Sequence, residues 1–179
     1  MSFTADAVGA PPSGWTCGMT GQGRPRWTVQ PEAGKQVLVQ SGAATFPWCV
    51  VSGSAVADGW VEVKFKPLRG REDQAGGLVW RWKDGDHYYV ARANALENNV
   101  SLYYTEGGTR KKIQYVDTPV QANMWHTLRV AFSGTRIQVS FDGQPKIDLQ
   151  DAHIAGPGKV GVWTKADSVT AFDAFSYGP

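Results

Sequence analysis

The chain has 179 residues, among them 8 Trp, 6 Tyr, 7 Phe and 21 Gly. This length suits one domain with a substantial core, and many aromatic residues with many glycines favour short strands and tight turns over helices. The 18 basic and 16 acidic residues leave a net charge of +2, so we expect no nucleic-acid partner, which would require a basic surface. No apolar run approaches the roughly 20 residues that span a bilayer, so we expect no membrane insertion.

The first third of the chain is the least regular part. Residues 5–35 contain Pro11-Pro12 and several glycines, and we expect them to wrap the edge of the fold as loops. Cys17 and Cys49 follow aromatic residues in similar loop-like sequence. Two interpretations stay open: a disulfide that closes a loop of about 30 residues, or two unpaired, buried thiols.

From Trp60 onward, apolar and polar residues alternate with the period of two that is typical of strands. One strand is predicted from Trp60 to Lys66, ending at Pro67. The next, from Gly77 to Lys83, continues through a turn into a returning strand over His87 to Ala95. Strict alternation in its first arm separates two faces, one with Leu78, Trp80 and Trp82, the other with Val79, Arg81 and Lys83.

The second half of the chain continues the same pattern in short runs separated by turn residues. We interpret Arg110-Lys111-Lys112 as the solvated end of a hairpin. About ten or more short strands with one wet face each must stack or close to bury their apolar faces. The sequence therefore predicts a single all-β domain over residues 1–179, a two-sheet antiparallel jelly-roll sandwich.

Several common chemistries are disfavoured by spacing. The three histidines are widely separated and lack zinc-ligand spacing. The glycines at 156, 158 and 161 precede a predicted strand and not a helix, so they do not form a dinucleotide fingerprint. A retaining glycosidase needs two carboxyl groups about 5 Å apart, whereas Glu72 and Asp73 are adjacent and would point to opposite faces of a strand.

A scattered set of polar and aromatic residues is a better candidate site. Arg92 and Asn94 share one face of a predicted strand, and Trp163 and Lys165 share a face opposite the core. Aromatic rings and planar polar groups are the residue types that bind sugars; the alternative is a set of ordinary surface ion pairs. The predicted carbohydrate-binding residues are Gln74, Arg81, Arg92, Asn94, Trp163, Lys165 and Asp167.

Several segments together resemble the 3-keto-disaccharide hydrolase-like domains, which are related to laminin-G and concanavalin A-type sandwiches. The resemblance extends nearly from end to end and is carried by Phe3–Trp15, Glu72–Arg81, Tyr88–Val100, Trp125–Val130, Phe141–Gly143, Gly158–Ser168 and Phe172–Phe175. It implies a concanavalin A-like lectin/glucanase fold and a bacterial, often exported domain directed at carbohydrate. The family's closing Phe-Asp-Asp-Phe occurs here as Phe-Asp-Ala-Phe, which leaves Asp173 as a weak candidate for a structural calcium ion; no cofactor is required.

Three functions follow as hypotheses. The first is glycan binding on the concave face of a sheet. The second is a hydrolase or lyase acting on 3-keto-glycosides, with Glu72, Asp73 or Lys165 as the base. The third is a structural or protein-interaction sandwich. The sequence starts without a basic and apolar leader. Because the resemblance implies an exported domain, we expect a periplasmic or secreted protein whose signal peptide is absent from this chain.

Overall fold

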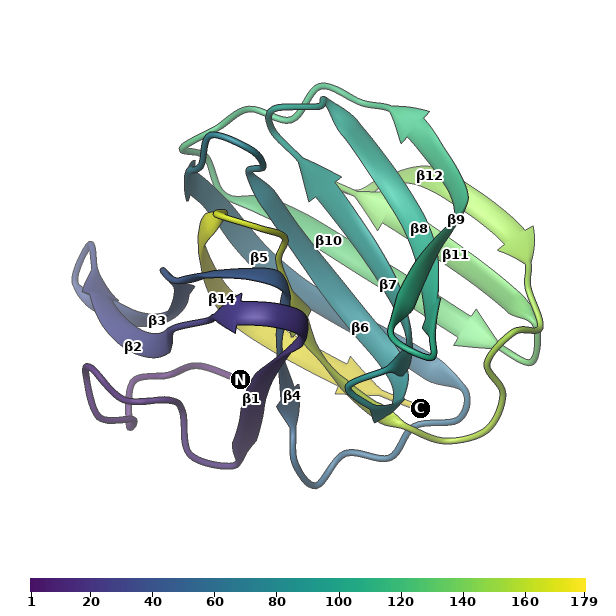
Figure 1. Cartoon of the computed structure of the whole chain (residues 1–179), viewed down its shortest axis with the longest axis horizontal. Coiled ribbons are helices and arrows are strands. Elements are labelled where there is room, and N and C mark those ends of the chain that lie inside the picture. The colour runs from purple at the N-terminus through teal and green to yellow at the C-terminus, as the bar shows by residue number, and fades with distance from the viewer.

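The computed structural model describes all 179 residues as a sandwich of two seven-stranded antiparallel sheets without helices, which confirms the predicted fold class. Figure 1 shows the two sheets lying one in front of the other. No helix is long and apolar enough to cross a membrane. The strands are β1 Trp15–Arg24, β2 Trp27–Glu32, β3 Lys35–Gln40, β4 Ala43–Val51, β5 Gly59–Arg69, β6 Ala75–Asp84, β7 His87–Asn94, β8 Asn99–Glu106, β9 Thr109–Asp117, β10 His126–Ser133, β11 Arg136–Phe141, β12 Gln144–Gln150, β13 Lys159–Trp163 and β14 Val169–Gly178.

Strand order defines two sheets that we name by number. Sheet I has the order β1-β4-β13-β6-β7-β8-β9, and sheet II has the order β12-β11-β10-β5-β14-β3-β2. The chain passes between the sheets several times, so each sheet is built from strands that are distant in sequence. The loops after β5 and β13 both join one sheet to the other, a connection that becomes important for the candidate site.

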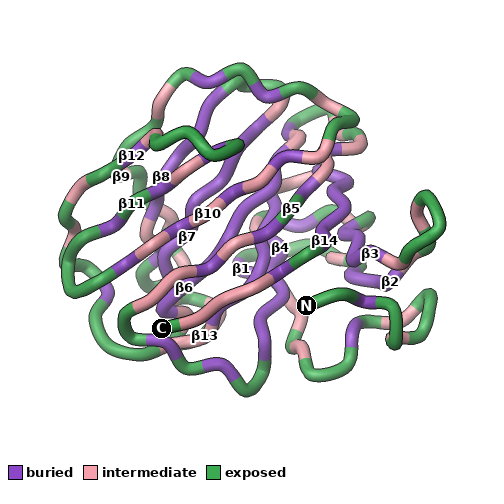
Figure 2. Tube along the Cα trace, turned by 180° about the vertical axis from the view of Figure 1, so that it is seen from behind, coloured by how far each residue is buried: buried purple, intermediate pink, exposed green.

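The main core lies between the two sheets. In sheet II, Val61, Val63 and Phe65 of β5 face it, and the intervening residues face outward. Figure 2 shows this alternation of buried and more exposed positions along β5 and β10. The period-two pattern of the sequence therefore identifies the core face of sheet II correctly.

The outward face of sheet I folds over on itself. Phe46 on β4 and Arg110 on β9 are five strand steps apart, which in a flat sheet spans about 24 Å. The guanidinium carbon of Arg110 nevertheless lies 4.9 Å from the centre of the Phe46 ring. We call this strongly curved outward surface the concave face. It carries a second buried layer made of Trp48, Val50, Ala75, Val79, Tyr88, Val90, Tyr103 and Trp163.

The prediction of loops over residues 5–35 is confirmed for residues 5–14 and wrong from Trp15 onward. Residues 15–24 and 27–32 form β1 and β2, and the segment around Cys49, also expected to be loop-like, belongs to β4. β1 lacks an apolar alternation because its register with β4 is irregular between Thr20 and Gly23, where two glycines have positive φ. Because a bulge interrupts the period-two alternation, such a strand is not recognised from the sequence pattern.

A second bulge reverses the predicted faces of β6. Arg81 has a φ of +46°, and the pairing of β6 shifts on both sides of it. Trp82 is thereby turned to the concave face, where its ring meets that of Trp48 at 5.0 Å. Arg81 is turned the other way, toward Phe132 of the main core. Strict alternation predicts the opposite placement for both residues.

Pro67 does not end its strand, which continues to Arg69. The pairing of β5 with β10 stops at Phe65, so Pro67 faces no partner strand on that side. On the other side it lies opposite Thr170 of β14, next to a register irregularity. Proline is tolerated where no ladder hydrogen bond requires its missing N–H.

Cys17 and Cys49 form a disulfide between directly opposed residues of β1 and β4. Their Cα atoms are 4.0 Å apart and their separation in sequence is 32 residues. Cys49 is fully buried in the main core. Of the two interpretations that the sequence leaves open, the structure supports the bonded one, and the bond ties edge strand β1 to sheet I.

Replacement of both cysteines by alanine is expected to lower the free energy of unfolding by about 3–4 kcal/mol, because the unfolded chain regains the freedom of a loop of this length. Denaturant unfolding followed by tryptophan fluorescence measures the change. Wild-type protein under reducing conditions serves as the control and should lose a similar amount. Equal stability of the oxidised wild type and the double variant would contradict the prediction.

Candidate functional site

Three loops meet at one end of sheet I, beside the concave face. They are residues 70–74 between β5 and β6, residues 95–98 between β7 and β8, and residues 164–168 between β13 and β14. Two of them carry the chain from one sheet to the other. The antiparallel order β13-β6-β7 places the relevant ends of these strands next to each other. Residues about ninety positions apart in sequence therefore become neighbours here.

Asp167 holds the 70–74 loop in place. Its carboxylate accepts backbone hydrogen bonds from Arg71 at 2.7 Å, from Glu72 at 3.1 Å and from Asp73 at 3.2 Å. Burial alone would raise the pKa of Asp167, but the hydrogen bonds from Arg71, Asp73 and Glu72 outweigh it and lower that pKa below its ordinary value. Asp167 thus acts as an anionic anchor for three consecutive N–H groups.

Asp73 lies at the centre of the site with its side chain only 2% exposed. One carboxylate oxygen accepts a hydrogen bond from Asn94 at 2.8 Å and faces Arg92 at 3.5 Å. The other accepts from the Lys165 ammonium at 2.9 Å. A buried carboxylate requires such partners because desolvation is otherwise costly. Asp73 therefore links strand β7 to the loop that follows β13.

Arg92 extends this network across the concave face. Its side chain is 3% exposed, and one terminal nitrogen donates to the Glu97 carboxylate at 2.7 Å and to the Tyr103 hydroxyl at 3.0 Å. Burial alone would raise the pKa of Glu97, but the charge and hydrogen bonds of Arg92, with the Asn99 amide, bring it below its ordinary value. Arg92 therefore stabilises the ionised form of Glu97.

Arg110 is not the solvated hairpin end that its basic neighbours suggest. Its guanidinium carbon lies 4.0 Å from the centre of the Tyr103 ring and 5.9 Å from that of Trp163. Burial lowers the pKa of Arg110, and one of its terminal nitrogens is buried without a hydrogen-bond partner in the chain. Strong curvature of sheet I causes this placement, because it folds β9 over the aromatic residues of β4 and β13.

A hollow of about 440 Å³ opens beside this cluster. The Phe46 ring forms one side, and Glu72, Lys165 and Asp167 form another. Phe46 stacks on Trp163 with ring centres 5.5 Å apart, so its own ring is the accessible member of the pair. An aromatic surface beside an ammonium and two carboxylates supplies both stacking and hydrogen-bonding groups.

The structure brings together most of the predicted site residues but divides them into two layers. Arg92, Asn94 and Trp163 are buried and form the foundation. The half-buried residues Gln74, Lys165 and Asp167, with exposed Glu72, form the accessible layer. The prediction that Arg92, Asn94 and Trp163 bind carbohydrate directly is therefore corrected, because these residues lie beneath the surface. Asn94, for example, accepts hydrogen bonds from the backbone of Leu96 and Glu97.

Two predicted residues lie elsewhere. Arg81 is 4% exposed and donates to the carbonyls of Ala57, Ile154 and Gly134. It lies at the other end of β6 from the site, and its hydrogen bonds give it a structural role. Asp173 forms an ion pair with Lys35 at 2.7 Å on sheet II. No group of three or more His, Cys, Asp or Glu side chains is arranged to hold a metal ion, and the structural calcium ion stays a prediction.

The sequence analysis misses four residues of the site: Phe46, Glu97, Tyr103 and Arg110. Phe46 lies in a segment interpreted as a loop, and Arg110 belongs to a basic run interpreted as solvated. Glu97 carries a usable signal, because it follows Arg92 and Asn94 directly at the strand end. Tyr103 becomes recognisable only when the register of β7 with β8 is known.

Comparisons with known proteins show the fold. No family model matches the chain, and no curated protein matches it. Among solved structures, the carbohydrate binding module CBM66 from Bacillus subtilis superposes with a TM-score of 0.77 and 21% identity, covering 93% of this chain and 96% of that chain. A β-glucanase from Bacillus licheniformis has a TM-score of 0.65 and 16% identity, with 98% and 95% covered.

The fold is that of the concanavalin A-like lectins and glucanases. A protein of unknown function with a galectin-like fold from Bacillus subtilis extends the set, with a TM-score of 0.64, 11% identity, and 87% and 88% of the two chains covered. Identities this low establish the concanavalin A-like architecture and leave the chemistry of the site to be argued from its own residues.

Replacement of Asp73 by Ala is expected to destabilise the protein by about 3–5 kcal/mol, because the buried Arg92 guanidinium loses a buried carboxylate partner. Chemical denaturation measures the effect. The matched control is Asp148→Ala, which removes an exposed partner of Arg136 and should leave stability nearly unchanged. Similar destabilisation by the two substitutions would contradict the central role of Asp73.

The lowered pKa of Glu97 predicts a pH dependence of stability. A carboxyl group with a depressed pKa in the folded state stabilises above its unfolded pKa, and this contribution is lost as pH falls through the folded value. Thermal unfolding from pH 7 to pH 3 should therefore show the loss only at the acidic end. Glu97→Gln should remove part of this acid sensitivity, and an unchanged pH profile in the variant would contradict the assignment.

Proposed function

We propose that this protein binds carbohydrate at the hollow on the rim of the concave face. The observation that carries the proposal is the pairing of an accessible aromatic ring, Phe46, with the polar groups of Lys165, Glu72 and Asp167 around one sugar-sized space. Aromatic rings stack on the C–H faces of sugars, and planar or charged polar groups bind their hydroxyls.

The foundation beneath the hollow supports the same proposal. Lys165 is held by Asp73, and the 70–74 loop is held by Asp167, so the polar groups are fixed before any ligand arrives. Preorganised groups lose less conformational freedom on binding, which favours affinity.

The comparisons add support of a more general kind. The solved structure with a TM-score of 0.77 is described as a carbohydrate binding module, and the β-glucanase is described as an enzyme of the same architecture. Both descriptions concern those proteins. They support the proposal because a carbohydrate binding module and a β-glucanase share the architecture of this chain.

Binding is favoured over hydrolysis by the state of the candidate bases. The Asp73 carboxylate is engaged by Asn94, Arg92 and Lys165, which also occupies the Lys165 ammonium. A general base must reach the proton that it removes, and neither of these two groups is free to do so. Glu72, the third candidate base, lies exposed at the hollow, so hydrolysis remains the alternative function. The resemblance to 3-keto-disaccharide hydrolase-like domains therefore supports a carbohydrate ligand and not a particular reaction.

We also propose that the protein works outside the cytoplasm. The Cys17–Cys49 disulfide supports this location, because structural disulfides form and persist in oxidising compartments. Fractionation of the native organism with detection by antibody tests the location. Protein confined to the cytoplasmic fraction would contradict it.

Replacement of Lys165 by Met is expected to lower carbohydrate affinity about 10- to 100-fold, since a hydrogen bond to a charged group contributes roughly 1.5–3 kcal/mol. Affinity electrophoresis with a panel of polysaccharides identifies a ligand, and isothermal titration calorimetry with its oligosaccharides measures the change. The matched control is Lys64→Met on the exposed face of sheet II, which should bind like the wild type. Thermal unfolding verifies that both variants are folded.

If Lys165→Met is folded and binds with wild-type affinity, the proposed location of the site is contradicted. Failure of every polysaccharide in the panel to bind the wild type would contradict the proposed function itself.

A further inference from the structure

An aromatic side chain projects from the opposite side of the sandwich. Trp60 lies on β5, whose next residues Val61 and Val63 face the main core, so the indole points away from it. The ring is partly exposed on the outward face of sheet II. A single exposed aromatic residue needs no functional explanation, but the neighbours of Trp60 are unusual.

The residues beside Trp60 on both adjacent strands are the smallest available. Trp60 pairs with Gly178 of β14 on one side and with Ala131 of β10 on the other. A β-carbon at Gly178 would lie 3.1–3.3 Å from three atoms of the indole, so a glycine leaves the space that the ring occupies. A hollow of about 370 Å³ opens beside the indole, and Ala131 is part of its lining.

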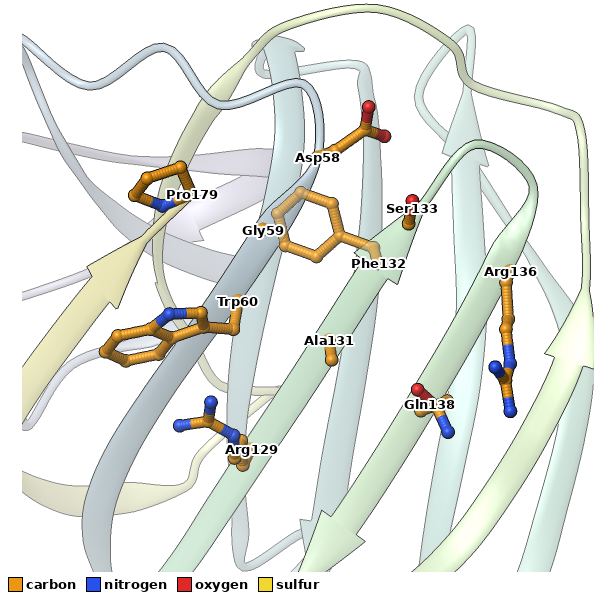
Figure 3. A pocket seen from close by; sticks show the side chains of 10 residues that line it. All are labelled: Asp58, Gly59, Trp60, Arg129, Ala131, Phe132, Ser133, Arg136, Gln138 and Pro179. Atoms are coloured by element: carbon orange, nitrogen blue, oxygen red, sulfur yellow. The ribbon is translucent and has the colours of Figure 1, made fainter.

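Planar polar side chains surround this hollow. Figure 3 shows Trp60, Arg129 and Gln138 on three neighbouring strands of sheet II, with Arg136 at the far side. The Arg129 guanidinium carbon lies 4.3 Å from the centre of the indole. Gln138 follows Ala131 in the same transverse row, because these two residues pair across β10 and β11. An aromatic ring beside guanidinium and amide groups is a sugar-binding combination.

Charge around the hollow is already balanced within the chain. Arg129 pairs with Glu62 at 3.3 Å, and Arg136 pairs with Asp148 at 2.9 Å. Asp58 at the rim faces Arg81 at 3.3 Å. An anionic or cationic ligand would have to displace one of these partners, whereas a neutral ligand can hydrogen-bond to the same groups without disturbing them. The occupant that fits is therefore a neutral, hydroxyl-rich molecule.

We propose a second carbohydrate site in this hollow, which binds a neutral oligosaccharide with one sugar ring stacked on Trp60. Arg129 and Gln138 hydrogen-bond its hydroxyls, Ala131 provides the room, and Gly178 accommodates the indole itself. The site shares no residue with the hollow on the concave face, so either site can fail without the other. Because the two hollows lie on the outward faces of different sheets, one molecule can contact two glycan chains and gain avidity on a polymer.

The test uses the whole chain and neutral oligosaccharides prepared from β-glucan, inulin and galactomannan. The indole N–H resonance of Trp60 is assigned by its absence in Trp60→Phe, and each oligosaccharide is titrated in nitrogen-15 spectra. At least one oligosaccharide should shift this resonance, also in the Lys165→Met variant. That background separates the second site from the first, because it weakens the concave-face site and leaves the residues around Trp60 unchanged.

Substitutions measure the energetic contribution of the hollow. Trp60→Ala should weaken binding of the active oligosaccharide in the Lys165→Met background about tenfold or more, the loss expected from removing one stacked ring. Gly178→Ala keeps the indole but crowds it, and should also weaken binding. The matched control is Trp125→Ala, because Trp125 also lies on the outside of sheet II but is flanked by the Lys35 and Lys66 ammonium groups.

Three results would overturn the proposal. The first is that no neutral oligosaccharide shifts the Trp60 resonance at millimolar concentration. The second is that Trp60→Ala in the Lys165→Met background binds as strongly as its parent. The third is a dimer in sedimentation experiments that Trp60→Ala dissociates, which would make the hollow a contact between two copies of this chain. Circular dichroism on each variant ensures that a loss of binding is not a loss of fold.

Discussion

The curvature of sheet I is the constraint on which the rest of this structure depends. It brings β9 over β4, so that Arg110 and Phe46 meet although five strand steps separate them. The fold that results has two apolar layers, one between the sheets and one on the concave face. Because the second layer is covered mainly by sheet I itself, the polar groups at its rim are held on a rigid and largely dry surface.

Asp73 converts this curvature into a site. Its carboxylate joins Arg92 and Asn94 of β7 to Lys165 of the loop after β13. The three elements are far apart in sequence, and a buried charge is stable only while all of them are in place. The same interaction that stabilises one end of sheet I therefore positions the accessible Lys165 ammonium, so stability and recognition rest on one group.

The sequence predicts the sandwich and most of the regular strands, because strict alternation in segments such as β10 reports directly on burial. It predicts poorly wherever a bulge interrupts that period. Arg81 and Trp82 exchange faces at one bulge, and β1 escapes notice because of another. The site residues Arg92, Asn94 and Lys165 are predictable as a group, but their burial is not, since it arises from curvature that a local pattern does not encode.

The double coverage of sheet I has a consequence for protein engineering. Tyr88 and Tyr89 of β7 are adjacent in sequence and face opposite layers, yet both are fully buried. Sheet I therefore offers almost no position in its central strands where a new side chain can be introduced without repacking. Substitutions are tolerated better at the outward positions of sheet II and at the loop ends. A redesigned recognition surface is therefore best placed there, with the curved sheet retained as an unaltered scaffold.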